Sequence, residues 1–149
     1  MSKPKIVLGT DHAGFELKEE IKKYLLSKGY EVDDKGAHSF DEEDDYPDFI
    51  FPAAKEVAKG KNSLGIIFGG SGQGQAICAN RVNGIRAAVY NTNNLELITL
   101  SKLHNNANVL SIGARFISKT DAIKAVSLWL STEFTGEERH IRRIKKLDK

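Results

Sequence analysis

The chain has 149 residues, 40% of them hydrophobic and 28% charged, with a formal net charge of +2. This composition is typical of a globular protein with a sizeable core, and so small a net charge gives no support to nucleic-acid binding. The single cysteine, Cys78, excludes an internal disulfide and a cysteine-based zinc cluster. We expect a cytoplasmic protein without a signal peptide or membrane span, in which Cys78 is a small buried side chain.

The first third of the chain alternates between apolar runs and helical patterns. We expect a buried strand over residues 6–8, then a polar loop and an amphipathic helix from Phe15 that Lys28–Gly29 ends, and a second short strand that begins with residues 30–32. The acidic run 41–45 is interpreted as a solvated loop, with metal binding as the rival interpretation. Pro47 then begins a helix that ends near Gly60.

The rest of the chain continues the alternation. The predicted elements are a strand over 66–68, a helix over 75–80, a strand over 85–89, a helix over 95–103, a strand over 109–112, a helix over 122–130 and a basic helix over 137–146. Strand and helix alternate five times, so we predict an α/β fold in three α/β/α layers, with a five-stranded parallel, Rossmann-like sheet and a C-terminal basic helix. No linker or repeat divides the chain, and one domain is expected over residues 1–149.

A glycine-rich turn follows the third predicted strand. Its spacing, Gly70-x-Gly72-x-Gly74, lacks both the G-x-G-x-x-G frame of dinucleotide folds and the Lys–Ser/Thr pair of phosphate-binding NTPase loops. Glycines between a strand and a helix let main-chain N–H groups approach an anion, either a phosphate or a developing oxyanion. The alternative is that the glycines only pack the helix against the sheet.

Polar side chains also follow the first and fifth predicted strands. Asp11 and His12 come after the first strand, and Arg115 comes after the fifth. In open parallel sheets ligands bind beyond the carboxyl ends of the strands, so these residues and the glycine turn should share one edge. His12 is a candidate phosphate ligand or general acid/base, with a hydrogen-bonded structural histidine as the alternative.

A second group of polar residues lies further along the chain. His104 and Asn105 follow a predicted helix, where His104 could serve as a helix cap. Arg139 and Arg143 are four residues apart, which places both guanidinium groups on one helix face, where they could hold a phosphate together. A solvated basic face is the alternative, and the compact spacing favours a small anion over nucleic acid.

Taken in order, these motifs resemble the type B ribose-5-phosphate isomerases, within the group that also holds galactose-6-phosphate isomerase. The matching segments cover nearly the whole chain and are 9–18, 45–47, 69–74, 79–81, 104–108 and Arg139–His140 with Arg143. The resemblance implies reversible aldose–ketose isomerisation of a sugar phosphate, typically of ribose 5-phosphate to ribulose 5-phosphate through an enediolate, without metal or organic cofactor. It also implies a homodimer, sometimes a tetramer, with each active site built from two subunits.

The resemblance implies a role for each matching position. These are Asp11 on the sugar hydroxyls, Ser71 and His104 in ring opening, Tyr46 and Asn105 around the sugar, His12, Arg115, Arg139 and Arg143 on the phosphate, and the N–H groups of Gly70, Gly72 and Gly74 on the enediolate.

The position of the base departs from the family pattern. One type in the family carries a Cys where this chain has Gly69, and the other carries a Glu where this chain has Gln75. A carboxamide cannot take a proton from carbon. Three interpretations stay open: an impaired isomerase or non-catalytic sugar-phosphate binder, an isomerase whose base is another residue such as Asp11 or Cys78, and an introduced substitution at Gln75. A hexose 6-phosphate of the allose or galactose type is an alternative substrate.

Overall fold

The computed structural model describes residues 2–148, so residues 1 and 149, the ends of the predicted domain, lie outside it. Five parallel strands form one sheet in the order β2-β1-β3-β5-β4. The strands are β1 (Lys5–Thr10), β2 (Val32–Asp34), β3 (Ser63–Gly69), β4 (Ala87–Tyr90) and β5 (Val109–Gly113). The helices are the short 3₁₀ helix η1 (His12–Gly14), α1 (Phe15–Ser27), α2 (Pro47–Lys59), α3 (Gln73–Ala79), α4 (Leu95–Leu103), α5 (Lys119–Ser131) and α6 (Glu138–Lys145).

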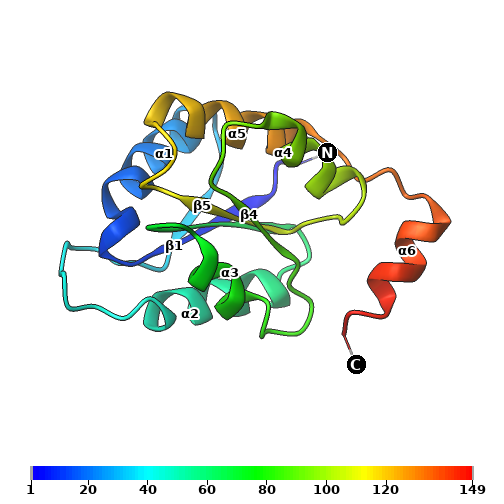
Figure 1. Ribbon diagram of the computed structural model, residues 1–149, viewed down its shortest axis with the longest axis horizontal. Coiled ribbons are helices and arrows are strands. Elements are labelled where there is room, and N and C mark those ends of the chain that lie inside the picture. Colours follow the sequence, from blue (N-terminus) through cyan, green and yellow to red (C-terminus); the bar gives the residue numbers. More distant parts are fainter. Residues whose placement is uncertain (1, 149) are drawn as a thin grey trace.

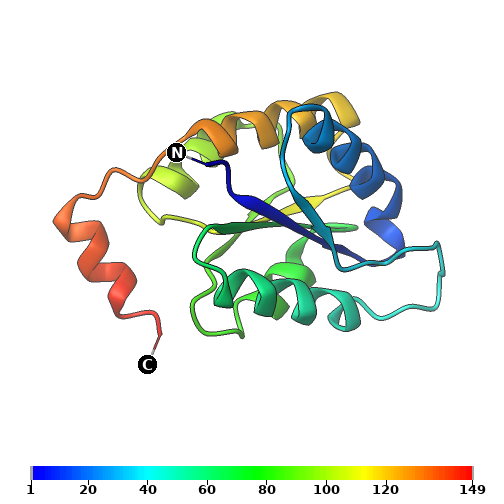
Figure 2. The ribbon, with the colours of Figure 1, turned by 180° about the vertical axis from the view of Figure 1, so that it is seen from behind.

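The helices cover both faces of the sheet, which confirms the predicted three-layer α/β/α fold (Figures 1 and 2). Helices α1, α4 and α5 lie on one face, where Trp129 and Phe68 belong to the larger core. Helices α2 and α3 lie on the other face, where Val7, Ile67 and Cys78 belong to a second core. Strand residues alternate between the two cores, as expected for a parallel sheet buried on both sides. No helix within residues 2–148 is long and apolar enough to span a membrane.

Helix α6 stands outside these layers. It follows α5 through an extended segment and projects beyond the end of the sheet, on the right of Figure 1. Of its residues only His140 is buried. The predicted C-terminal basic helix therefore exists, but it contributes almost nothing to either core.

Several predicted boundaries differ from the structure by a few residues, and two of these differences have identifiable reasons. The second strand was expected to begin with residues 30–32 but covers Val32–Asp34, because lysines neutralise acidic residues that alone disfavour a strand. Helix α5 begins three residues earlier than expected, at Lys119, since the Ser118 side chain accepts a hydrogen bond from the N–H of Asp121 and caps the helix.

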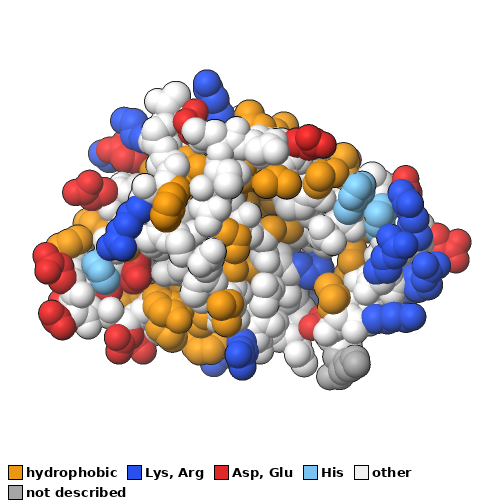
Figure 3. All heavy atoms as spheres, viewed as in Figure 1, with side chains coloured by type: hydrophobic (Ala, Val, Ile, Leu, Met, Phe, Trp, Pro, Cys, Tyr) orange, Lys and Arg blue, Asp and Glu red, His pale blue; other side chains and the backbone are white. Residues whose placement is uncertain are grey.

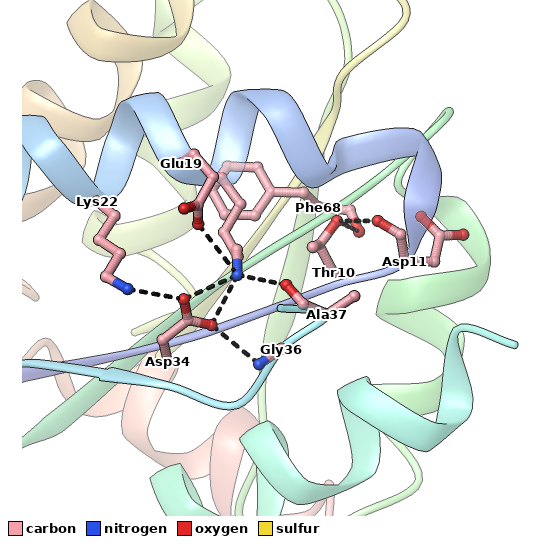
Figure 4. Close-up of polar contacts among 9 residues, drawn as sticks. Thr10, Asp11, Glu19, Lys22, Asp34, Gly36, Ala37 and Phe68 are labelled. Carbon is pink, nitrogen blue, oxygen red and sulfur yellow. Dashed lines mark hydrogen bonds and ion pairs between the residues drawn. The ribbon is translucent and has the colours of Figure 1, made fainter. Parts of the chain in front are cut away.

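A buried ion pair joins α1 to β2 (Figure 4). Lys18 is fully buried, and its Nζ lies 2.8 Å from both carboxylate oxygens of Asp34 and 2.6 Å from the carbonyl oxygen of Ala37. Burial opposes ionisation of Asp34, but hydrogen bonds from Lys18, the N–H of Gly36 and Lys22 hold its pKa below the ordinary value. This pair fixes the start of the loop that crosses the carboxyl edge of the sheet towards α2.

Candidate active site

The glycine turn links the end of β3 to α3. Gly72 has a φ of 81°, a left-handed conformation that favours glycine. The Ser111 hydroxyl donates to the carbonyl oxygen of Gly72 at 2.6 Å, and Asn91 Nδ2 donates to the carbonyl oxygen of Ser71 at 3.0 Å. Ser111 lies on β5 and Asn91 directly after β4, so neighbouring strands hold the turn in place.

Asp11 and Gln75 meet beside this turn. Their side chains come from the end of β1 and from α3, and the two residues are only 7% and 4% exposed. Gln75 Nε2 donates to Asp11 Oδ2 at 3.4 Å, while the N–H of Ala13 donates to Asp11 Oδ1 at 3.1 Å. Burial raises the pKa of Asp11, against the lowering effects of His12 and of backbone hydrogen bonds.

Gly69 leaves the space that the Gln75 side chain fills. A Cβ atom at position 69 would lie 2.0–2.2 Å from the three terminal atoms of the Gln75 carboxamide. A side chain at position 69 and a long polar side chain at position 75 therefore exclude each other in this conformation. This gives a physical reason why the two patterns of the resembling family, Cys at one position and Glu at the other, would be alternatives.

His12 is paired with a residue that the sequence analysis placed in solvent. Its Nδ1 lies 2.7 Å from Asp44 Oδ1, which also accepts a hydrogen bond from the His12 backbone N–H at 3.1 Å. The hydrogen bond to Asp44 is the largest influence on His12 and raises its pKa. The prediction that the whole run 41–45 is solvated is thus wrong for Asp44, because a histidine compensates its burial.

Tyr46 and Arg115 reach the glycine turn from two further loops. A Cβ atom at Gly74 would lie 3.0 Å from Cζ of Tyr46, and one at Gly70 would lie 3.0 Å from a terminal nitrogen of Arg115. A cavity of about 470 Å³ opens beside Arg115, and its lining residues are His12, Ala13, Glu16, Phe40, Glu42 and Arg115. The carboxyl edge thus brings together Asp11, His12, the glycine turn and Arg115, as the sequence predicted, and the structure adds Tyr46 and Gln75 to them.

The same edge has a geometry that could admit a cation. Asp11, His12 and Asp44 each offer one ligand atom, and these atoms lie within 4.8 Å of one another. The His12–Asp44 hydrogen bond already occupies two of the three donors. That the reaction needs no metal stays a prediction.

The second predicted group lies at the opposite edge of the sheet. His104 ends α4 and Asn105 follows it, just before the start of β5. Val109, at that start, pairs with Gly65 near the start of β3, whereas the glycine turn follows the other end of β3. Seven residues of extended chain span about 20 Å. Within one copy of the chain, the two groups therefore cannot contact the same small ligand.

Helix α6 adds its charges to this second group. The rings of His140 and His104 are stacked with centroids 4.6 Å apart, and a cavity of about 270 Å³ beside them is also lined by Asn105 and Arg143. Burial lowers the pKa of His140, with the charge of Arg139 acting in the same direction. Arg139 itself is exposed and donates to Glu137 Oε2 at 3.1 Å. Figure 3 shows Lys and Arg side chains clustered on α6 and acidic side chains at the other end.

Cys78 is not placed to act in either group. It packs in the core between α2 and α3, and burial raises the pKa of its thiol. The prediction of a small buried side chain is confirmed. Three supporting residues were not predicted from the sequence, namely Asp44, Asn91 and Ser111. Their only signal in the sequence is that each lies in a strand or loop at the predicted ligand edge.

Comparisons with known proteins agree with this architecture. The family model for Ribose/Galactose Isomerase matches residues 6–147. Ribose-5-phosphate isomerase B of Mycolicibacterium paratuberculosis is 41% identical over 140 residues, 94% of this chain and 87% of that protein. The crystal structure of a ribose 5-phosphate isomerase from Thermotoga maritima is 42% identical, has a TM-score of 0.92 and covers 99% of both chains.

A ligand-bound structure is also similar. Ribose-5-phosphate isomerase B of Mycoplasma genitalium, solved with bound ribulose 5-phosphate, is 40% identical with a TM-score of 0.90, and the match covers 96% of this chain and 93% of that chain. Sequence identity of this level over nearly the full length leaves one assignment. The chain belongs to the ribose/galactose isomerase family.

Proposed function

We propose that this chain interconverts ribose 5-phosphate and ribulose 5-phosphate, an aldose–ketose isomerisation. The observation that carries the proposal is the carboxyl edge, where a buried carboxylate on Asp11 lies beside a glycine turn held open by Gly72. Moving a proton between two carbons requires a positioned base, and the enediolate oxygen requires donors already in place. The family assignment and the ribulose 5-phosphate bound to the Mycoplasma genitalium relative support the choice of substrate.

The proposed site is completed by a second copy of the chain. His12 and Arg115 offer cationic groups at the carboxyl edge, while His104, Asn105 and Arg143 lie at the opposite edge around their own cavity. A homodimer, or a tetramer built from it, would place one copy's α6 against the partner's carboxyl edge. The acidic end and basic end in Figure 3 have complementary charge, which supports that contact.

Each side chain then has a defined task. His104 and Ser71 assist opening of the sugar ring, and Tyr46 and Asn105 surround the open chain. His12, Arg139 and Arg143, with Arg115, bind the phosphate, and the N–H groups of the turn face the developing oxyanion. Phosphate binding at a distance from the reacting carbons orients them for proton transfer. The cytoplasmic location stays a prediction.

The test is a turnover assay with purified protein. Ribose 5-phosphate should be converted to ribulose 5-phosphate, and scattering in solution should give at least twice the mass of one chain. Allose 6-phosphate and galactose 6-phosphate serve as competing substrates, and faster turnover of either would replace the pentose assignment. Saturable binding of ribose 5-phosphate with no conversion would instead support a binding protein.

A further inference from the structure

The contact between Asp11 and Gln75 has a consequence for the reaction. The Gln75 carboxamide lies where a Cβ atom of residue 69, directly before the glycine turn, would stand, and its Nε2 is 3.4 Å from Asp11 Oδ2. Gln and Glu have nearly the same shape, so a carboxylate at position 75 would occupy this same place. The Asp11 carboxylate therefore lies within hydrogen-bond distance of the position that the base occupies in the resembling proteins.

We infer that Asp11 is the general base of this isomerase and that the Gln75 carboxamide holds it in position. The inference rests on the proposed function. Gln75 can donate a hydrogen bond but cannot accept a proton from carbon, whereas Asp11 can do so and is one of few ionisable groups buried at this edge. The Ala13 N–H donates to Oδ1, so the second oxygen, Oδ2, is the one that faces Gln75.

The amide at position 75 is what makes Asp11 suitable. Two carboxylates 3.4 Å apart in a buried site would repel each other and share one proton. With Gln75 there, one negative charge remains and receives a hydrogen bond. Burial also raises the pKa of Asp11, which brings a carboxylate closer to the basicity that proton transfer near neutral pH requires.

The proton transfers balance as follows. Asp11 takes the proton from C2 of the open-chain aldose, the C2–H electron pair becomes the C1=C2 bond, and the carbonyl pair moves to O1 to give the enediolate. The hydroxyl proton on O2 passes to O1. The protonated Asp11 then returns its proton to C1, which takes the C1=C2 pair, and the pair on O2 forms the new C2 carbonyl. Asp11 ends as it began.

The test follows the proton as well as the product. Asp11→Asn keeps the acceptor for the Ala13 N–H and removes only the base, so both isomerisation and loss of label from ribose 5-phosphate deuterated at C2 should fall roughly 10²–10⁴-fold. Binding of inorganic phosphate, measured by calorimetry, should stay unchanged and reports that the variant is folded. Label loss within about tenfold of the unaltered chain would overturn the inference.

Two variants at position 75 make the test specific. Asp11→Asn combined with Gln75→Glu moves the carboxylate across the contact and should recover label loss relative to Asp11→Asn alone. Gln75→Glu alone should not raise kcat, because a base is already present. A rise of about 10²-fold or more in Gln75→Glu would mean that the unaltered chain lacks a base, which contradicts the inference but leaves the proposed function standing. If neither chain converts ribose 5-phosphate, it is the proposed function that fails.

The positioning role of Gln75 has its own readout. Gly69→Ala would displace the carboxamide without touching Asp11, since the new Cβ would meet the end of a flexible side chain. Asp11 would lose a donor, so its pKa should rise and the acid limb of kcat should move to higher pH. The charged groups facing this pair are His12 and Asp44, with Arg115 beyond His12, and none of them changes. An unmoved acid limb would overturn the role given to Gln75.

Discussion

Both edges of the sheet carry polar residues, but those at one edge are buried and those at the other are exposed. At the carboxyl edge, Asp11 and Gln75 are buried and hydrogen-bonded, and neighbouring strands hold the turn beside them. At the amino edge, His104 and Arg143 are exposed, and the latter sits on a helix with one buried residue. The first group makes its contacts within one copy of the chain, whereas the second group is exposed and available to another copy.

This difference indicates which part of the chemistry each group performs. Proton transfer needs a dry, rigid arrangement fixed to within fractions of an ångström, which a sheet edge provides. His12 and Arg115 supply part of the proposed phosphate site at the carboxyl edge, and the exposed cations of α6 on a second copy would supply the rest. The buried edge is therefore expected to control kcat, and the exposed edge to control substrate affinity and association.

The largest expected effect is on the activity of a mixture of two inactive variants, which tests whether the two edges of different copies form one site. Asp11→Asn removes the proposed base, and the double variant Arg139→Ala/Arg143→Ala removes cations of the other edge, so each should lose about 10²-fold or more in kcat/KM. Refolding the two together should recover about a quarter of the unaltered activity, because half the dimers are mixed and each has one intact site.

The matched control combines two lesions at the same edge. In a mixed dimer of Asp11→Asn with His12→Ala, each chain has a damaged carboxyl edge and an intact amino edge. Both lesions belong to the carboxyl edge, so each site carries one of them and no activity should return. Recovery in this control, or none in the first mixture, would contradict a shared site.

The buried ion pair beneath the carboxyl edge should be the next most sensitive point. Lys18→Met leaves the Asp34 carboxylate buried without its main partner and should cost about 3–5 kcal/mol of unfolding free energy. Lys22→Met, which removes a partly exposed cation from the same carboxylate, should cost about 1 kcal/mol or less. Urea unfolding of both variants measures the difference.

The sign of the pH dependence distinguishes this pair from a packing effect. The pKa of Asp34 is held below its ordinary value, so its contribution to stability is present above the ordinary carboxyl pKa and is lost as pH falls through the lowered one. The excess stability of the unaltered chain over Lys18→Met should therefore shrink in acid. An equal difference at every pH would point to lost packing of the Lys18 stem instead.

The sequence was sufficient for the fold and for the carboxyl edge, because both depend on local patterns. Apolar periodicity located five strands and six helices, and the rule that ligands bind at the carboxyl ends gathered Asp11, His12 and the glycine turn. The sequence could not show which buried charges are neutralised by residues far away along the chain. The run that contains Asp44 was interpreted as solvated, and the pattern gave no sign that the second strand includes Asp34; only the fold shows that His12 and Lys18 neutralise these two carboxylates.

The amino edge was harder for a related reason. His104, Asn105, Arg139 and Arg143 were identified from spacing and resemblance, but nothing local in the sequence says that they lie a full strand length from Asp11. Each helix between two parallel strands runs back from the carboxyl edge to the amino edge, so His104, at the end of α4, lies at the amino edge. This separation from Asp11 follows from the sheet topology and not from local sequence patterns. The roles of the individual site residues remain predictions.

The His12–Asp44 pair should produce a smaller effect, confined to the pH dependence of phosphate affinity. Asp44 raises the pKa of His12, so His12 stays cationic to higher pH and binds phosphate there. In Asp44→Asn the loss of affinity with rising pH should begin at lower pH. Inhibition by inorganic phosphate across pH measures this, with Glu43→Gln as control, since Glu43 is exposed in the same loop. Identical profiles for both variants would remove Asp44 from the site.

The smallest change in the stability of a single copy should come from a substitution next to α6. Leu147, just after α6, is 63% exposed, so Leu147→Asp should change the unfolding free energy of one copy by about 0.5 kcal/mol or less. Leu26→Asp, at a 54% exposed position on α1, is the matched control.

The unfolding midpoints of the two variants should nevertheless depend differently on protein concentration. If a second copy covers the amino edge, the unfolding midpoint of the unaltered chain rises with concentration, because association stabilises only the folded form. Leu147→Asp should weaken that rise and Leu26→Asp should preserve it. If Leu147→Asp instead lowered the unfolding free energy by several kcal/mol at every concentration, as truncation of a core side chain does, α6 would belong to the core of a single copy. The contrast between a buried carboxyl edge and an exposed amino edge would then be wrong.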